Sequence, residues 1–177
     1  GPAFANALKK KGFTSLTAVQ ARVLDPALAG RDLRITSQTG SGKTVAIGLA
    51  VRDLIEQSVD APPNKATPSV LVVAPTRELA KQVEEELSWL YAGVGARVVG
   101  VTGGASVRDE LRALSREPRI VVGTPGRLLD HLKRKAIHPE LIGAVALDEA
   151  DRMLDLGFKE DLEAILNGLP PTALQVA

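Results

Sequence analysis

A glycine-rich segment with the composition of a phosphate-binding loop occupies residues 39–44, which read Thr-Gly-Ser-Gly-Lys-Thr. Glycines let successive backbone N–H groups turn toward one anion, and the N-terminus of a following helix adds partial positive charge. The ammonium group of Lys43 could reach the outer phosphates of a nucleotide, and the hydroxyl of Thr44 could bind Mg²⁺. The strict pattern requires glycine at position 37, where this chain has serine. A plain glycine-rich turn with a solvated lysine is the alternative.

Three acidic residues follow an apolar run in the second half of the chain. Asp148, Glu149 and Asp151 belong to the stretch Asp-Glu-Ala-Asp. If that run is a strand ending across from the phosphate loop, Asp148 could be a second Mg²⁺ ligand and Glu149 could orient or deprotonate an attacking water. Acidic residues at a helix N-terminus are common for another reason, since they complement the helix dipole. Their occurrence together with the phosphate-loop lysine and threonine favours a nucleotide site.

Short apolar segments, separated by amphipathic ones, must position these groups. Five segments rich in Val, Ile and Leu predict strands: residues 32–37, 70–75, 96–101, 119–124 and 144–149. They are mostly continuous rather than alternating, which is typical of strands buried on both faces of a parallel sheet. Between them, three stripes show helical spacing: Leu79, Val83, Leu87 and Leu90; Val107, Leu111 and Leu114; and Leu162, Ile165, Leu166 and Leu169. We predict an α/β domain with a mostly parallel central sheet and helices on both faces.

Nearly every predicted strand leads directly into a polar or Gly/Pro-rich group. The groups read QTGSGKT, PTRELA, TGG, TPGR and DEAD. Because the carboxyl ends of parallel strands lie at one edge of a sheet, where open α/β domains bind ligands, these groups should meet at a single edge. Lys43 and Asp148 at opposite edges would contradict the nucleotide site.

Length and composition narrow the possible functions. The 177 residues suffice for one well-buried domain, and a net charge of +1 gives no overall basic surface for nucleic acid. With three Phe, one Trp and one Tyr the chain lacks a base-stacking platform, so nucleic acid should be held by its sugar-phosphate backbone. There is no cysteine, and no apolar run approaches the roughly 18 residues of a membrane helix, so we expect a cytoplasmic protein without a membrane partner. His131 and His138 lack metal-ligand spacing.

Six motifs occur in the order found in one helicase family. They are GFTSLTAVQ (12–20), SQTGSGKT (37–44), PTRELA (75–80), GG (103–104), TPGR (124–127) and DEAD (148–151). With them the chain resembles the N-terminal RecA-like P-loop NTPase domain of a DEAD-box ATP-dependent RNA helicase over nearly its whole length. That family has a small residue where the strict phosphate loop has its first glycine, which accounts for Ser37. Leu16 and Ala18 stand where the family commonly has prolines.

The resemblance implies a role for each motif. Gln20 would recognise the adenine edge, because its amide carries a donor and an acceptor, and Asp151 would connect motifs. The catalytic residues would be Lys43, Asp148 and Glu149, with Mg²⁺ held by Thr44 and Asp148. The ATP-binding residues would be Phe13, Gln20, Ser37, Gln38, Thr39, Gly40, Ser41, Gly42, Lys43 and Thr44. The RNA-binding residues would be Pro75, Thr76, Arg77, Gly103, Gly104, Thr124, Pro125, Gly126 and Arg127. For Arg77 and Arg127, bracing of the local structure is the alternative.

The implied function is that of an ATP-dependent RNA helicase, in which RNA-stimulated ATP hydrolysis separates short duplexes. The resemblance ends at Ala177, before the family's Ser-Ala-Thr motif and its C-terminal RecA-like domain, so we expect residues 1–177 to be the N-terminal domain. An arginine finger contributes roughly 10³–10⁵ in rate. Without one, we expect binding of ATP or ADP with Mg²⁺ and of part of the RNA backbone, but weak or absent hydrolysis. Two alternatives stay open: a P-loop NTPase of another class, such as a DNA translocase, and a non-catalytic interaction module.

Overall fold

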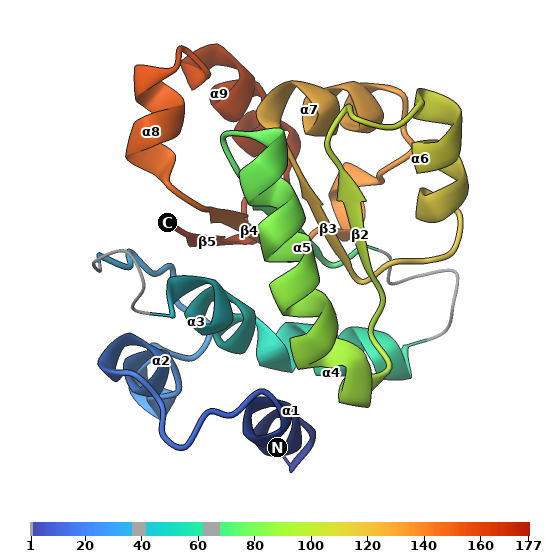
Figure 1. The fold of residues 1–177 in the computed structure, drawn as a ribbon. Coiled ribbons are helices and arrows are strands. Elements are labelled where there is room, and N and C mark those ends of the chain that lie inside the picture. Colours follow the sequence, from blue (N-terminus) through green and yellow to red (C-terminus); the bar gives the residue numbers. More distant parts are fainter. Residues whose placement is uncertain (1, 37–41, 62–67) are drawn as a thin grey trace.

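Five short apolar strands form one parallel sheet, in the order β2-β3-β1-β4-β5, in the computed structural model of the chain (Figure 1). The structure describes residues 2–36, 42–61 and 68–177. The strands are β1 (Val70–Val73), β2 (Val98–Val101), β3 (Ile120–Gly123), β4 (Ala144–Leu147) and β5 (Leu174–Val176). Every described pairing is parallel, which confirms the predicted fold class.

Helices connect the strands and cover both faces of the sheet. In the described part of the chain they are α1 (Pro2–Lys10), α2 (Ala18–Val23), α3 (Lys43–Ala50), α4 (Arg52–Asp60), α5 (Arg77–Tyr91), α6 (Val107–Leu114), α7 (Pro125–Lys133), α8 (Ala150–Asp155) and α9 (Lys159–Gly168). Single 3₁₀ turns lie at Pro26–Leu28, Ala92–Val94 and Pro139–Leu141. Figure 1 shows α5 crossing one face of the sheet next to α3. No helix of the described residues is long and apolar enough to cross a membrane.

Strand β1 shows why the apolar runs are continuous. Val70 and Val72 belong to a core that includes residues of α1, α3 and α5, whereas Leu71 and Val73 belong to a second core with residues of α7, α8 and α9. Successive side chains of a strand point to opposite faces, so a sheet covered on both faces needs an apolar residue at every position.

Four strands end level with one another at the carboxyl edge of the sheet. Val101 pairs with Gly123, Gly123 with Val73, and Val73 with Leu147. The segments that follow these strands therefore lie along one edge in the order 102–104, 124–127, 74–77 and 148–151. The groups predicted to contact nucleic acid occupy the β2-β3-β1 side, and the acidic residues occupy the β4 side.

The prediction of a strand at residues 32–37 is wrong for its described part. Residues 32–36 form only an isolated parallel bridge, between Leu33 and Val176. The N–H of Leu33 donates to the carbonyl oxygen of Gln175 at 2.8 Å, and the N–H of Ala177 donates to that of Leu33 at 2.9 Å. The N–H of Ile35 also donates to the carbonyl oxygen of Ala177, so this segment follows residues 175–177 through backbone hydrogen bonds without forming a ladder. β5 is not predicted from the sequence, because its three residues, Leu-Gln-Val, are too few to show the periodicity of a strand.

The predicted apolar stripe of α6 is also wrong at one position. Leu111 is 38% exposed, whereas Glu110, the residue before it, is 3% exposed. The spacing of Val107, Glu110 and Leu114 is i, i+3 and i+7, which places a carboxylate on the inward face of the helix.

Candidate functional site

The N-terminal end of α3 carries the described part of the predicted phosphate loop. Lys43 and Thr44 are the first two residues of α3, and Gly42 is the N-cap with a φ of 80°. Glycine adopts this left-handed backbone without strain. No described side chain caps the helix, so its first N–H groups are available to an anion. Five predicted ATP-binding residues lie outside the described residues: Ser37, Gln38, Thr39, Gly40 and Ser41.

Gln20 is buried and joins α2 to the start of α3. Its Oε1 accepts a hydrogen bond from the N–H of Thr17 at 3.0 Å, and its Nε2 donates to the carbonyl oxygen of Gly42 at 3.2 Å. A Cβ added to Gly42 would lie 2.1 Å from that amide nitrogen. Glycine at position 42 therefore allows close approach as well as the left-handed backbone. The predicted adenine contact of Gln20 stays a prediction, beside this structural role.

The start of α2 is fixed by a capping box rather than by proline. The Thr17 hydroxyl accepts from the N–H of Gln20, and the Gln20 side chain accepts from the N–H of Thr17. This reciprocal pair satisfies two N–H groups that a helix start otherwise leaves open. The absence of proline at Leu16 and Ala18 is thus compensated locally. Phe13 stacks on Trp89 with ring centroids 5.9 Å apart, so its predicted place at ATP stays a prediction.

Asp148 follows β4 and lies buried beside a lysine and a second carboxylate. Its N–H donates to the carbonyl oxygen of Val73 at 2.8 Å, which extends the β1–β4 pairing past the strand. Burial raises the pKa of Asp148 above its usual value, the positive charge of Lys43 opposes this shift, and the negative charge of Glu149 adds to it. Lys43 is therefore close enough to Asp148 for their charges to interact, as a shared nucleotide site requires.

Glu149 forms the turn between β4 and α8. It is the N-cap of α8 and has a φ of 54°, in the left-handed region that a non-glycine residue rarely adopts. Such strain costs on the order of 1–3 kcal/mol and concentrates at functional sites. Nη1 of Arg152 lies 3.3 Å from Oε2 of Glu149 and orients the carboxylate.

A cavity of about 710 Å³ is lined by residues from both halves of the predicted nucleotide site. Lys43 lines one part of it, and Glu149 and Asp151 line another. Residues 32–36 complete the wall together with Gln175 and Ala177. Residues more than 100 positions apart in sequence thus face one space at the carboxyl edge of the sheet, and their roles toward a nucleotide stay a prediction.

Asp148 is the predicted carboxylate ligand of a magnesium ion, and Lys43 is the positive charge that opposes the rise of its pKa. Glu149 forms its ion pair with Arg152. A cation at Asp148 would offset the cost of its burial, and the predicted second ligand, Thr44, stands in the first turn of α3. No group of three or more described His, Asp or Glu side chains could hold a metal alone. This donor set fits Mg²⁺, which proteins commonly bind through one or two carboxylates plus substrate phosphates.

The segment after β1 begins the predicted nucleic-acid side. Thr76 is the N-cap of α5, and its hydroxyl accepts a hydrogen bond from the N–H of Leu79 at 3.2 Å. Pro75 is buried, whereas Arg77 is exposed. Its exposure leaves Arg77 accessible to a phosphate, and the predicted RNA contact stays a prediction.

The segment after β3 has a different cap. Thr124 is the N-cap of α7 and Pro125 follows as the first helical residue, but the Thr124 hydroxyl makes no capping bond. The N-terminus of α7 therefore offers both backbone N–H groups and a hydroxyl that is not used for capping. Gly126 is exposed within that first turn. This geometry is compatible with the predicted backbone contact of this segment.

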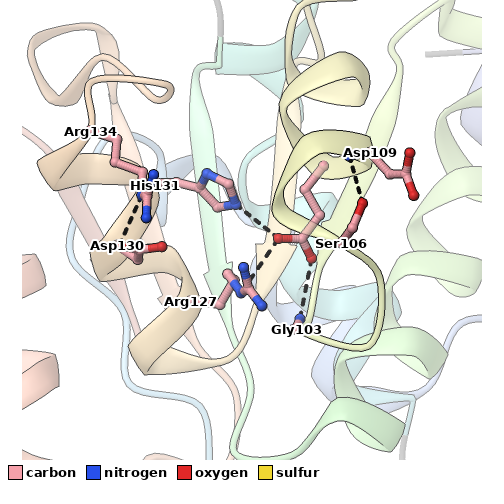
Figure 2. Close-up of polar contacts among 8 residues, drawn as sticks. Gly103, Ser106, Asp109, Arg127, Asp130, His131 and Arg134 are labelled. Carbon is pink, nitrogen blue, oxygen red and sulfur yellow. Dashed lines mark hydrogen bonds and ion pairs between the residues drawn. The ribbon is translucent and has the colours of Figure 1, made fainter.

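Arg127 and Gly103, the first glycine of the pair after β2, both contact the buried Glu110 (Figure 2). Gly103 has a φ of 81°, and Gly104 is exposed. Arg127 forms an ion pair with Glu110 at 3.5 Å, so the bracing alternative has a specific partner. Glu110 and its other partner His131 have no role in the predicted site. Glu110 is not predicted from the sequence, although the i, i+3, i+7 spacing of Val107, Glu110 and Leu114 is compatible with an inward-facing carboxylate.

Comparison with known proteins gives consistent matches. The family model of the DEAD/DEAH box helicase matches residues 17–177. The chain is 43% identical over 164 residues to the DEAD-box ATP-dependent RNA helicase CshA of Bacillus licheniformis, covering 93% of this chain and 32% of that protein. It is 44% identical over 163 residues to the CshA protein of Streptococcus pneumoniae, covering 92% of this chain and 30% of that protein. The chain thus spans about a third of the length of these relatives.

A solved structure shows the same fold. A hypothetical ATP-dependent RNA helicase from Sulfolobus tokodaii superposes with a TM-score of 0.85 at 30% sequence identity. The match covers 99% of this chain and 49% of that one.

Proposed function

Since the chain belongs to the DEAD/DEAH box helicase family, we propose that it is the ATP-binding domain of an enzyme that hydrolyses ATP to separate RNA strands locally. The observation that carries the proposal is the single cavity lined by Lys43, Glu149 and Asp151. It is supported by the charge interaction between Lys43 and Asp148.

The proposed chemistry divides among four side chains. Lys43 and the open N–H groups of α3 bind the outer phosphates of ATP. Thr44 and Asp148 would hold Mg²⁺, which when bound neutralises charge on the phosphate oxygens. Glu149, held by Arg152 at the cavity wall, orients the attacking water and accepts its proton. Gln20 would contribute recognition of adenine once ATP is bound.

RNA would be held along the β2-β3-β1 side of the same edge. The groups gathered there are backbone N–H groups at glycine turns and helix N-termini, with two arginines, Arg77 and Arg127. Such groups contact phosphate and sugar oxygens and carry no sequence information. We therefore propose binding of the RNA backbone without base recognition.

We propose that residues 1–177 act as an N-terminal RecA-like domain together with a C-terminal RecA-like domain. The chain spans 32% of the Bacillus licheniformis relative, so the coupled activity belongs to the full-length protein. An arginine finger in trans contributes roughly 10³–10⁵ in rate. Residues 1–177 alone should therefore bind ATP-Mg²⁺ and hydrolyse it slowly.

Nucleotide titration tests the proposal. Labelled ATP and ADP are titrated into the wild-type chain and its Lys43→Ala variant, with and without Mg²⁺ and with GTP as competitor. Binding should need Mg²⁺ for full ATP affinity, resist GTP, and be lost in Lys43→Ala. The exposed Lys10→Ala substitution on α1 is the control and should bind like wild type.

Other outcomes separate the alternatives. GTP competing as well as ATP would point to a P-loop NTPase of another class, and a DNA-stimulated ATPase would point to a translocase. A folded chain that binds neither nucleotide would leave the non-catalytic interaction module.

A further inference from the structure

Glu110 is a buried carboxylate whose described partners all belong to segments other than its own helix (Figure 2). Its Oε2 accepts a hydrogen bond from the N–H of Gly103 at 3.2 Å. Its Oε1 lies 2.9 Å from Nε2 of His131 and 3.5 Å from Nε of Arg127. The carboxylate therefore joins α6 to the glycine turn after β2 and to α7.

The burial of Glu110 requires all of these contacts. A carboxylate that is 3% exposed is strongly unfavourable unless donors compensate for the lost water. His131 is fully buried, and its Nδ1 has no partner among the described residues. Among the described partners of Glu110, Arg127 is the one whose positive charge does not depend on pH, and the two side chains form an ion pair at 3.5 Å.

Arg127 is held on two sides. Its Nε faces Glu110, and its Nη2 lies 3.3 Å from the point where a Cβ on Gly103 would stand. The guanidinium group thus packs against the bare Cα of a glycine whose φ is 81°. The Arg127 side chain remains 21% exposed, so part of it reaches solvent.

We propose that Glu110 is a positioning residue for RNA-backbone recognition: it fixes the Arg127 guanidinium and the Gly103–Gly104 turn at one separation, so that both contact the same run of phosphates. The inference rests on the proposed function. It combines the two alternatives for Arg127, which are bracing of the local structure and contact with RNA. The ion pair with Glu110 holds the guanidinium group in place, and the guanidinium group held in this way contacts phosphate. Glu110 acts through Arg127 and Gly103, and it does not touch RNA.

The direction in which one substitution changes the affinity for RNA tests this inference. A carboxylate that merely lay near RNA would repel phosphates, so its removal would strengthen binding. Glu110→Gln keeps the size of the side chain but offers one acceptor oxygen to three donors. We expect Glu110→Gln to weaken binding of a labelled single-stranded RNA of about ten nucleotides by roughly three- to tenfold. The measurement uses the full-length protein saturated with a nonhydrolysable ATP analogue. Unchanged or tighter binding would overturn the inference.

A double-mutant cycle separates positioning from general damage. If Glu110 acts through Arg127, Glu110→Gln should weaken RNA binding by less than about twofold in an Arg127→Ala background. Fully additive losses would overturn the inference. Glu84→Gln is the matched control: this half-buried carboxylate on α5 accepts a hydrogen bond from the backbone of Gly100, in the strand that leads to Gly103. It should leave RNA affinity as in wild type.

Arg127→Ala alone distinguishes this inference from the proposed function. If full-length wild type binds no RNA, the proposed function fails. Suppose that wild type binds RNA, that Arg127→Ala weakens this binding and that Glu110→Gln does not. In that case only the positioning role of Glu110 fails.

Discussion

The side-chain amide of Gln20 donates a hydrogen bond to the carbonyl oxygen of Gly42, 3.2 Å away, across 22 positions of sequence. This bond links the capping box of α2 to the N-cap residue of α3. The segment predicted to recognise the base and the segment predicted to hold the phosphates are therefore directly connected.

Removing this connection should destabilise the free protein. Gln20→Ala deletes the donor to Gly42 and the acceptor for Thr17 at a buried position. A buried polar group left unpaired costs about 1–3 kcal/mol, so we expect a loss of that size in the free energy of unfolding. Urea unfolding without nucleotide measures it. Gln57→Ala, an exposed glutamine on α4, should change stability by less than about 0.5 kcal/mol. Equal effects of the two substitutions would refute the structural role of Gln20.

Gly42 should tolerate alanine less well than other left-handed glycines. Gly12 has a φ of 84° with nothing within 4 Å of an added Cβ, whereas a Cβ on Gly42 would lie 2.1 Å from the Gln20 amide. Both substitutions strain the backbone by about 1 kcal/mol, and Gly42→Ala adds a steric clash. Thermal unfolding should rank Gly42→Ala below Gly12→Ala. Adding Gln20→Ala removes the clash, so the double variant should lose less than the sum of the single losses; a strictly additive loss would exclude the clash.

Neutralising Asp148 should stabilise the nucleotide-free protein. The pKa of Asp148 is raised, chiefly by burial, so the folded state binds its proton more tightly than the unfolded state does. Stability from this group is present below the ordinary pKa of 3.8 and is lost as pH rises through the raised value. Asp148→Asn should therefore increase the melting temperature at about pH 7 and lose most of that advantage at about pH 4. Asp151→Asn, an exposed neighbour, is the control; a lower melting temperature for Asp148→Asn at about pH 7 would contradict the argument.

The same substitution should weaken nucleotide binding. Asp148→Asn removes a predicted Mg²⁺ ligand, so the affinity of the chain for ATP should fall in the presence of Mg²⁺ and change little in its absence. A titration with and without EDTA measures both. Increased stability combined with decreased ligand affinity is the usual relationship at a functional site.

Glu149→Gln should separate binding from hydrolysis. The amide keeps the shape and the contact with Arg152 but cannot accept a proton from water. We expect RNA-stimulated turnover of the full-length protein to fall by about 10²–10⁴, with ATP affinity retained. Glu163→Gln, at an exposed position on α9, should turn over ATP at the wild-type rate. Undiminished turnover in Glu149→Gln would remove Glu149 as the base.

The sequence pattern predicts β1, β2, β3 and β4 and misses β5. β1, β3 and β4 are apolar throughout because they are buried on both faces of the sheet, whereas β2 lies at an edge and is buried only at alternate positions. Leu33 and Val176 meet in a single bridge: the segment containing Leu33 is predicted as a full strand, and β5, which contains Val176, is not predicted.

The residues of the candidate site likewise divide into those that motif spacing identifies and one that it does not. Motif spacing locates Lys43, Asp148 and Glu149, since each directly begins or follows a regular element. Motif spacing does not identify Glu110, because the burial of its carboxylate depends on Gly103, Arg127 and His131. These residues come close to Glu110 only when the chain folds.

The pairing of Leu33 with the last residues of the chain has a mechanical consequence. Residues 32–36 and Ala177 line the same cavity, and two backbone hydrogen bonds hold Leu33 to Gln175 and Ala177. A pull on the backbone at Ala177 would shift Leu33 with it, and residues 32–36 lead in sequence toward Gly42 and Lys43. Because Ala177 and Lys43 line the same cavity, a force applied at Ala177 should change the affinity of the nucleotide site proposed at Lys43.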